Sequence, residues 1–208
     1  MRSKHNLVGS LADESQASDK YRRILEAGVK VFARKGFHNA RVNEIAREAG
    51  VADGTIYIYF KNKDDILIKI FEESLALIIA RLKTELSRQT DAVAKVKLFI
   101  KMHLDLMKED QALGEVFQVE LRQSNKFMKE YLPQRYYDYL DVIAEILREG
   151  QKAGLFRPEI SPDIFKRALF GALDEISLFW ILRNREQGYL ENSREQLADI
   201  FLRGIARG

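Results

Sequence analysis

The sequence predicts an all-α fold, with a three-helix N-terminal domain followed by a larger helical bundle. Apolar residues recur every three or four positions over most of the 208 residues, which is the spacing of one helix face. Gly36, Gly50 and Gly154 interrupt this pattern where helices are expected to end. Alternation with period two occurs only at 57–60, which a helix explains better, so no strand is expected.

The N-terminal domain is expected at residues 19–63, after a flexible arm at 1–18. The arm is polar and shows no apolar periodicity. The first helix of the domain should run from about Lys20 to Lys35, with a buried stripe at helical spacing. Gly36 then provides the stop signal.

Two short helices joined by a tight turn are predicted between Arg41 and Lys63. Gly50 ends the first helix, and Asp53 is expected to be the N-cap of the second, which covers residues 54–60. Two helices joined in this way form a helix-turn-helix, whose second helix can enter the major groove of double-stranded operator DNA. The alternative is a plain corner of two helices with tyrosines at the domain edge.

The polar side chains of this helix pair are the candidate DNA contacts. Hydroxyl groups can donate to phosphate oxygens, and a threonine methyl can pack on a thymine. Thr55 and Tyr57 are expected nearest to the bases or to phosphates at the groove edge. The residues assigned to DNA are Asn43, Gly54, Thr55 and Tyr57, together with Arg41, Tyr59, Lys61 and Lys63 as phosphate contacts.

Positive charge is concentrated around this motif. The whole chain has a formal net charge of +3, whereas residues 19–63 hold ten lysines and arginines against five acidic residues. The remainder of the chain is therefore slightly acidic, and a basic N-terminal part is typical of a surface that meets a polyanion. An ordinary solvated surface explains any single lysine equally well.

The segment from Gly50 to Leu67 resembles the signature of tetracycline-repressor-type (TetR-family) regulators. It reads GVADGTIYIYFKNKDDIL, and the resemblance covers about residues 21–67. The resemblance implies a dimeric all-α repressor, whose larger C-terminal domain binds a small effector and forms the dimer. Arg41 departs from the family pattern, which often has a threonine there to cap the helix and touch a phosphate. An arginine can still reach a phosphate.

The second domain is expected at residues 64–208, as a helical bundle for effector binding and dimerisation. A long helix from about 63 to 88 would begin beside the DNA and end in this domain. Pro162 fits the first turn of a later helix that is apolar on nearly every side. Helices are further expected at about 91–108, 111–124, 126–153 (disturbed near Pro133), 162–183 and 192–206.

The surplus of apolar surface near the C-terminus predicts a homodimer. A helix without a polar face must be buried on all sides, and a partner's helix pair would cover it. Two symmetric heads also explain how a small DNA-binding unit gains affinity. The alternative is a core helix inside a monomer.

Large, soft side chains are the candidate lining of a ligand cavity between facing helices. Together they suit a long apolar tunnel for a small hydrophobic effector, although each one alone is explained as core. A histidine such as His103 on a mostly apolar helix is more often a satisfied core residue than a ligand contact, and Asp174 could bond a buried partner, a ligand or a dimer neighbour. The residues assigned to the effector are Phe99, Met102, His103, Leu106, Phe117, Leu121, Arg122, Phe170 and Asp174.

Two further segments resemble the fatty-acid-degradation (FadR-type) repressors of the same family. They are VELRQSN at 119–125 and FGALDE at 170–175. Those repressors bind long-chain acyl-CoA and then leave DNA, so the resemblance implies an acyl chain among the apolar side chains and Arg122 near the CoA phosphates. Arg122 could equally pair with Glu120 or Glu175. The alternatives are a repressor of an efflux or other metabolic operon with a different hydrophobic ligand and, more remotely, a helical interaction protein without DNA.

Other classes of function find little support in the sequence. The three histidines lie at no metal-ligand spacing, and no phosphate-binding glycine loop or nucleophile motif occurs. We therefore assign no metal, cofactor or catalytic residue, and we do not expect an enzyme. The absence of cysteine suits a cytoplasmic protein. No apolar run approaches the roughly 18 residues of a membrane span, so no membrane contact is expected.

Overall fold

The structure, a computed structural model, describes residues 6–120 and 134–207. In this part of the chain there is no strand, only one isolated antiparallel bridge between Phe156 and Ala206. The predicted all-α fold is confirmed. The elements are α1 (Asn6–Lys35), α2 (Val42–Ala49), α3 (Asp53–Tyr59), α4 (Lys63–Ser87), α5 (Ala92–Glu109), α6 (Gln111–Glu115), the π-helix η1 (Val116–Glu120), α9 (Gln134–Lys152), α10 (Pro162–Leu182) and α11 (Tyr189–Ile205).

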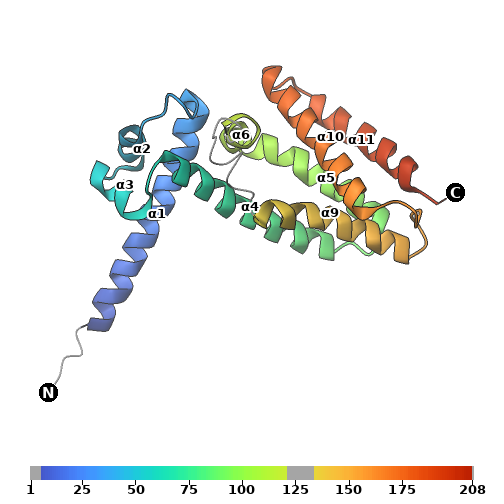
Figure 1. Cartoon of the computed structure of the whole chain (residues 1–208), viewed down its shortest axis with the longest axis horizontal. Coiled ribbons are helices and arrows are strands. Elements are labelled where there is room, and N and C mark those ends of the chain that lie inside the picture. Colours follow the sequence, from blue (N-terminus) through green and yellow to red (C-terminus); the bar gives the residue numbers. More distant parts are fainter. Residues whose placement is uncertain (1–5, 121–133, 208) are drawn as a thin grey trace.

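Helix α4 joins the two parts of the molecule. Figure 1 shows α1, α2 and α3 gathered at one end, and α5, α9, α10 and α11 at the other, with α4 running from the first group into the second. We call α1–α3 with the first turns of α4 the head, and the rest of α4 with the remaining helices the bundle. The arrangement fits the predicted long helix from about 63 to 88, because α4 starts in the head and ends between bundle helices.

Helix α1 is longer than the sequence pattern indicates. It begins at Asn6, whereas we expected the helix to start near Lys20 after a polar arm. Residues 6–18 contain no proline and several good helix formers, so their local propensity favours continuing the helix. The lack of apolar periodicity therefore did not predict a lack of helix.

The helix-turn-helix forms as predicted, with one different cap. Gly50 adopts the left-handed conformation at φ 65°, and Val51 N donates to Ala46 O, which closes α2. The N-cap of α3 is Ala52, and Asp53 is the first helical residue. The assignment of Asp53 as N-cap was therefore wrong by one position. Its carboxylate still lies in the first turn, where the helix dipole favours a negative charge.

A compact apolar core holds the head together. Ile56 and Phe60, four residues apart, are both fully buried, as their spacing predicts. The Phe60 ring stacks on Tyr21 of α1 with ring centroids 5.2 Å apart. The other fully buried head residues are Ile24, Val31, Phe32, Ile45, Ala46, Ile66 and Leu67. Because α4 contributes the last two, the head does not end where α4 begins.

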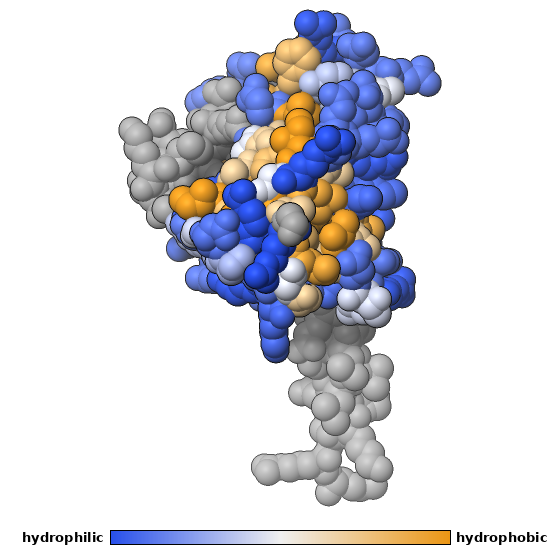
Figure 2. Space-filling view, turned by 90° about the vertical axis from the view of Figure 1, so that its right-hand side faces the viewer, coloured by the Kyte–Doolittle hydropathy of each residue, from blue (hydrophilic) through white to orange (hydrophobic). Residues whose placement is uncertain are grey.

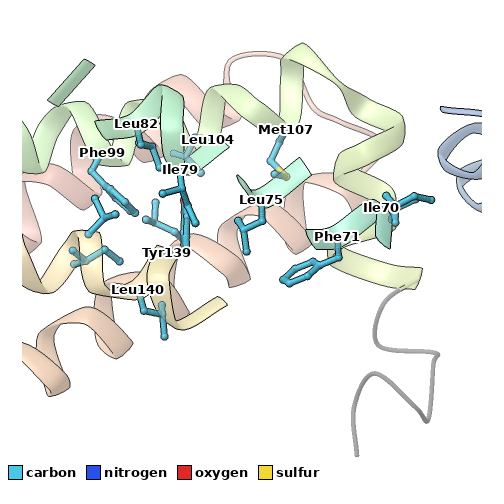
Figure 3. Close-up of a cluster of buried hydrophobic side chains, with 14 of the residues drawn as sticks. Ile70, Phe71, Leu75, Ile79, Leu82, Phe99, Leu104, Met107, Tyr139 and Leu140 are labelled. Carbon is cyan, nitrogen blue, oxygen red and sulfur yellow. The ribbon is translucent and has the colours of Figure 1, made fainter. Parts of the chain in front are cut away.

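The bundle core lies where α4, α5 and α9 face one another. Figure 3 shows the apolar side chains of these helices meeting in one cluster, with Phe71 and Leu75 of α4 near its end towards the head. Burying such side chains supplies roughly 1.5–3 kcal/mol each relative to leaving them in water. The core therefore fixes α4 against its neighbours along most of its length.

The segment after α5 departs from the predicted helix at 111–124. Helix α6 ends after Glu115, and the π-helix η1 continues to Glu120. Asp110 caps α6 by accepting a hydrogen bond from Leu113 N at 2.9 Å. The predicted helix at 126–153 is observed as α9 from Gln134, and its earlier part lies outside the described residues.

Candidate DNA-binding and effector sites

Helix α3 presents an open face to solvent. Tyr57 and Ile58 are 61% and 76% exposed, and Gly54 has no atom within 4 Å of the position that a Cβ would occupy. The sequence predicted Gly54 and Tyr57 here but missed Ile58. An exposed isoleucine on this face can pack on a thymine methyl, as a threonine methyl can. Its only signal in the sequence was its position between two tyrosines that were predicted to face outward.

The other predicted DNA contacts lie around this open face. Arg41, Asn43 and Lys61 are exposed, and Thr55 is half-buried at the start of α3. Tyr59 is also half-buried, because its ring packs edge-on against Tyr21 with centroids 6.1 Å apart. The assignment of these residues to DNA stays a prediction.

Lys63, a predicted phosphate contact, makes several contacts inside the head. Its Nζ donates to the main-chain oxygens of Phe37, His38 and Ala40 at 2.7, 3.0 and 3.4 Å. The same ammonium lies 4.6 Å from the centroid of the Phe37 ring. A lysine has three N–H donors, and all three are used inside the head. We therefore expect a structural role in place of the phosphate contact, in which Lys63 holds the α1–α2 turn on α4.

Part of the excess positive charge on α1 is balanced within the head. Arg34 Nη2 lies 3.4 Å from Glu48 Oε2, and Lys35 Nζ lies 2.5 Å from Glu44 Oε1. Glu44 also accepts a hydrogen bond from Arg41 N at 3.1 Å, which satisfies a donor at the start of α2. These contacts lower the pKa of the Glu44 carboxyl, chiefly through Lys35. Glu44 thus satisfies the amide of the N-cap residue, a different donor from the one that a capping threonine at position 41 would satisfy.

Aromatic rings dominate the predicted effector region. The Phe99 and Tyr139 centroids are 5.4 Å apart, the Phe170 and Tyr136 centroids 5.4 Å, and the Phe71 and Phe117 centroids 5.3 Å. These residues come from five elements: α4, α5, η1, α9 and α10. We call Phe99, His103, Tyr136, Tyr139 and Phe170, which ring contacts link, the aromatic cluster, and Phe71 and Phe117 form a separate pair. The structure thus brings together Phe99, His103 and Phe170 of the predicted set and adds Tyr136 and Tyr139, whereas Phe117 of the predicted set packs on Phe71.

A polar pair lies inside this cluster. His103 Nδ1 is 2.7 Å from the hydroxyl oxygen of Tyr139, and both side chains are buried. Burial lowers the pKa of His103 to about 4, so its ring is neutral at pH 7, and burial also raises the pKa of the Tyr139 hydroxyl. Within the described part of the chain, His103 Nε2 has no hydrogen-bond partner. A neutral imidazole with one free nitrogen can bind one polar group of a ligand.

The remaining predicted effector residues differ in position. Met102, Leu106 and Asp174 are half-buried, and the first two pack against the core. Leu121 and Arg122 lie outside the described residues. A separate groove of about 480 Å³ lies between α5 and α11 and contains none of the predicted effector residues. Its walls are Lys97, Leu98, Lys101, Arg194, Glu195, Ala198, Asp199 and Leu202.

Exposed apolar side chains lie on α10 and α11. Ile164 and Leu182 of α10 are 65% and 68% exposed, and Ile200 of α11 is also exposed. We expected α10 to be buried on all sides, but within one chain it is covered on one side only. Figure 2, which views the end of the molecule where these helices lie, shows an apolar strip between hydrophilic margins.

Two classes of site are not seen in the part of the chain that the structure describes. No group of three or more histidine, aspartate or glutamate side chains is placed to hold a metal ion there. Across the same residues, no helix combines the length and apolar character that crossing a membrane requires.

Comparisons with known proteins identify the family. The family model of tetR-family bacterial regulatory proteins matches residues 24–70, and the model of the C-terminal region of YsiA-like proteins matches residues 71–202. The fatty acid metabolism regulator protein of Bacillus subtilis (strain 168) is 35% identical over 190 residues, covering 91% of this chain and 97% of that protein.

Solved structures agree with the sequence matches. The fatty acid degradation regulator FadR from Bacillus halodurans superposes with a TM-score of 0.84 at 34% identity, covering 89% of this chain and 95% of that one. FadR from Bacillus subtilis in complex with stearoyl-CoA gives a TM-score of 0.83 at 34% identity, with 89% and 99% covered. This chain therefore belongs to the TetR family of bacterial transcriptional regulators, and its helix-turn-helix is a DNA-binding unit.

Proposed function

We propose that this protein is a homodimeric repressor that leaves its operator when a long-chain acyl-CoA binds in the bundle. The observation that carries the proposal is the aromatic cluster around His103, in a fold similar to that of a regulator bound to stearoyl-CoA. On this basis the protein controls genes of fatty-acid degradation in the cytoplasm and is not an enzyme.

The operator would be read by α3. Thr55, Tyr57 and Ile58 face the bases or the groove edge, and Gly54 lets the DNA backbone come close because nothing occupies its Cβ position. Outside the groove, the phosphates would be met by a rim of exposed or half-buried polar residues. This rim consists of Arg41, Asn43, Tyr59 and Lys61.

The homodimer would form through α10 and α11. Ile164, Leu182 and Ile200 give an apolar face that one chain leaves in water. Gly171 and Gly204 have no atom within 4 Å of a Cβ position, so a partner helix can approach them closely. In a two-fold dimer the same face of each chain would cover the other, and the two α3 helices would meet successive major grooves.

The effector would enter between α4, α5, α9 and α10. Its acyl chain would displace or separate the rings of the aromatic cluster, with Met102 and Leu106 along its path. The free Nε2 of His103 would meet a polar group such as the thioester carbonyl. Arg122 is proposed for the CoA phosphates, and Asp174 for a polar contact at the edge of the site.

Operator release tests this function directly. Genomic fragments retained by the purified protein are first used to find the operator, and its affinity is then measured with stearoyl-CoA, free CoA or stearate added. Stearoyl-CoA should lower operator affinity by roughly 5- to 150-fold, the usual range of such coupling, and free CoA should not. Release by another hydrophobic compound alone would support a repressor of a different operon. No binding to double-stranded DNA at low salt would refute the proposal.

The dimer has its own test with a matched control. Leu182→Glu places a charge on the exposed face of α10 and should yield monomers in native mass spectrometry, with loss of tight operator binding. Leu77→Glu changes a leucine of α4 that is 73% exposed and should leave the dimer intact. A dimeric Leu182→Glu protein would place the interface elsewhere.

A further inference from the structure

A buried carboxylate of the bundle reaches into the head. Glu120, the last residue of η1, is 6% exposed, and its Oε2 accepts a hydrogen bond from Phe37 N at 2.5 Å. Phe37 lies in the turn between α1 and α2, 83 positions earlier in the chain. We call this contact the interdomain hydrogen bond.

The turn is shaped to receive this carboxylate. Gly36 has φ +76°, a conformation that side chains rarely adopt, and a Cβ there would lie 3.7 Å from Glu120 Oε2. Burial raises the pKa of the Glu120 carboxyl, and the hydrogen bond from Phe37 N opposes that rise. A buried carboxylate is costly unless it is hydrogen-bonded, so losing the Phe37 contact would make this position of Glu120 unfavourable.

Glu120 is also close in the chain to Phe117, a residue of the predicted effector region. Phe117, three residues before it in the same π-helix, packs against Phe71 of α4 with ring centroids 5.3 Å apart. π-helical turns are rare in proteins, but those that occur are often found at functional sites. A ligand that separates Phe117 from Phe71 would move η1 away from α4, and Glu120 would move with it.

We propose that Glu120 is the positioning residue by which the bundle holds the head in its DNA-binding orientation, through the interdomain hydrogen bond, and that an acyl chain entering beside Phe117 breaks this bond. The inference rests on the proposed function, because it assigns the coupling between the same effector and the same DNA surface. It assigns Glu120 to the connection between the two sites instead of to either binding surface.

The proposal has a thermodynamic signature that simple damage to the fold lacks. If the bond stabilises the DNA-binding state relative to the effector-binding state, its loss shifts the balance between them. Operator affinity then falls and effector affinity rises. The fold-loss in operator affinity multiplied by the fold-gain in effector affinity equals the fold-change in the equilibrium constant between the two states. A hydrogen bond to a charged acceptor corresponds to a shift on the order of tenfold.

Three variants test this in the full-length protein. Glu120→Ala removes the acceptor, Glu120→Gln keeps an oxygen for Phe37 N, and Glu115→Gln is a control in the preceding helix. Glu115 pairs with Arg185 in the α10–α11 connection at 3.0 Å instead of with the head. Operator affinity is measured without effector, and stearoyl-CoA affinity is measured without DNA by titration calorimetry.

For Glu120→Ala we expect weaker operator binding and tighter stearoyl-CoA binding, with a combined factor of about tenfold. Glu120→Gln should give a smaller shift in the same directions, and Glu115→Gln none. In wild-type protein, hydrogen exchange of the Phe37 amide should accelerate when stearoyl-CoA is added, and in Glu120→Ala it should be fast from the start. Weakening of both affinities, or no change in either, would overturn the role of Glu120. Wild-type protein that ignores stearoyl-CoA would instead refute the proposed function.

Discussion

Lys61 and Lys63 make a matched pair, because the sequence suggested the same phosphate contact for both and the structure separates them. Lys61 is exposed just after α3, whereas the Lys63 ammonium donates to three main-chain oxygens of the turn at 37–40. We therefore expect Lys63→Met to destabilise the head and Lys61→Met to weaken DNA binding alone. Methionine keeps most of the side-chain length and removes the charge in both variants.

The expected loss of stability for Lys63→Met follows from its contacts. Hydrogen bonds to charged groups contribute about 1.5–3 kcal/mol each when they are shielded from water. The bonds to Phe37 O and Ala40 O are partly buried, but the bond to His38 O is exposed, so water replaces it. Removing the desolvated lysine charge offsets part of the loss. We expect a net cost of about 2 kcal/mol, which lowers Tm by roughly 4–8 °C in a chain of this size.

The assay combines thermal unfolding with DNA binding at several salt concentrations. Lys61→Met should leave Tm within about 1–2 °C of wild type, since exposed substitutions usually change stability by less than about 0.5 kcal/mol. It should reduce the slope of log K against log salt by roughly one, for one lost phosphate contact. Lys63→Met should lower Tm and keep the slope. An unchanged Tm with a reduced slope for Lys63→Met would refute the structural role and restore the phosphate contact.

Three further changes test other parts of the structure. Burial lowers the folded-state pKa of His103 from 6.5 to about 4, so the unfolded chain takes up a proton on this histidine before the folded chain does. The free energy of unfolding should therefore fall by about 1.4 kcal/mol for each pH unit as the pH drops from 6.5 to 4. Urea titrations of His103→Phe should lack this contribution to the slope. Gly150→Ala would place a Cβ 2.0 Å from Cδ2 of the buried Phe156, so we expect a loss of about 1–3 kcal/mol in the same titration, and an unchanged midpoint would contradict it. Asp91→Ala removes the acceptor for two amides at the start of α5 and should cost about 1 kcal/mol, measured by thermal unfolding, with Asp91→Asn as the variant that keeps the cap.

Local patterns in the sequence predicted the fold well. Helical periodicity placed α4, α5 and α10 to within a few residues, and the Gly50 turn fixed the helix-turn-helix. The burial of Ile56 with Phe60 followed from their spacing alone. These features depend on residues close together in the chain, where a side chain's neighbours are known once the helix is known.

Features that depend on distant segments were missed. The three carbonyl partners of Lys63 come from a turn 23–26 positions earlier, and nothing near Lys63 in the sequence signals them. Tyr139 joins His103 across 36 positions, and the π-helical turns of η1 replaced an expected α-helix. Exposed Ile58 was overlooked because an apolar residue inside a short helix is normally assigned to the core. In each of these cases the sequence analysis did not predict the surroundings of a residue, because apolar periodicity carries no information about them.

The turn at 36–40 is hydrogen-bonded to two different helices, so a ligand that moves one of them can release the turn from it. Lys63 holds the turn on α4 through carbonyl oxygens, whereas Glu120 holds it on η1 through an amide. Because the turn is short, we expect it to stay with one of the two helices when α4 and η1 part. N–H···O bonds fail within about 0.5–1 Å of added distance, so a ligand need not rotate the head by direct contact. Widening the gap between Phe71 and Phe117 by the thickness of an acyl chain is more than enough to release one of the two attachments. We expect the Lys63 attachment to be the one that persists. Lys63 makes three hydrogen bonds to the turn, and it lies on α4, the helix that also contributes to the core of the head.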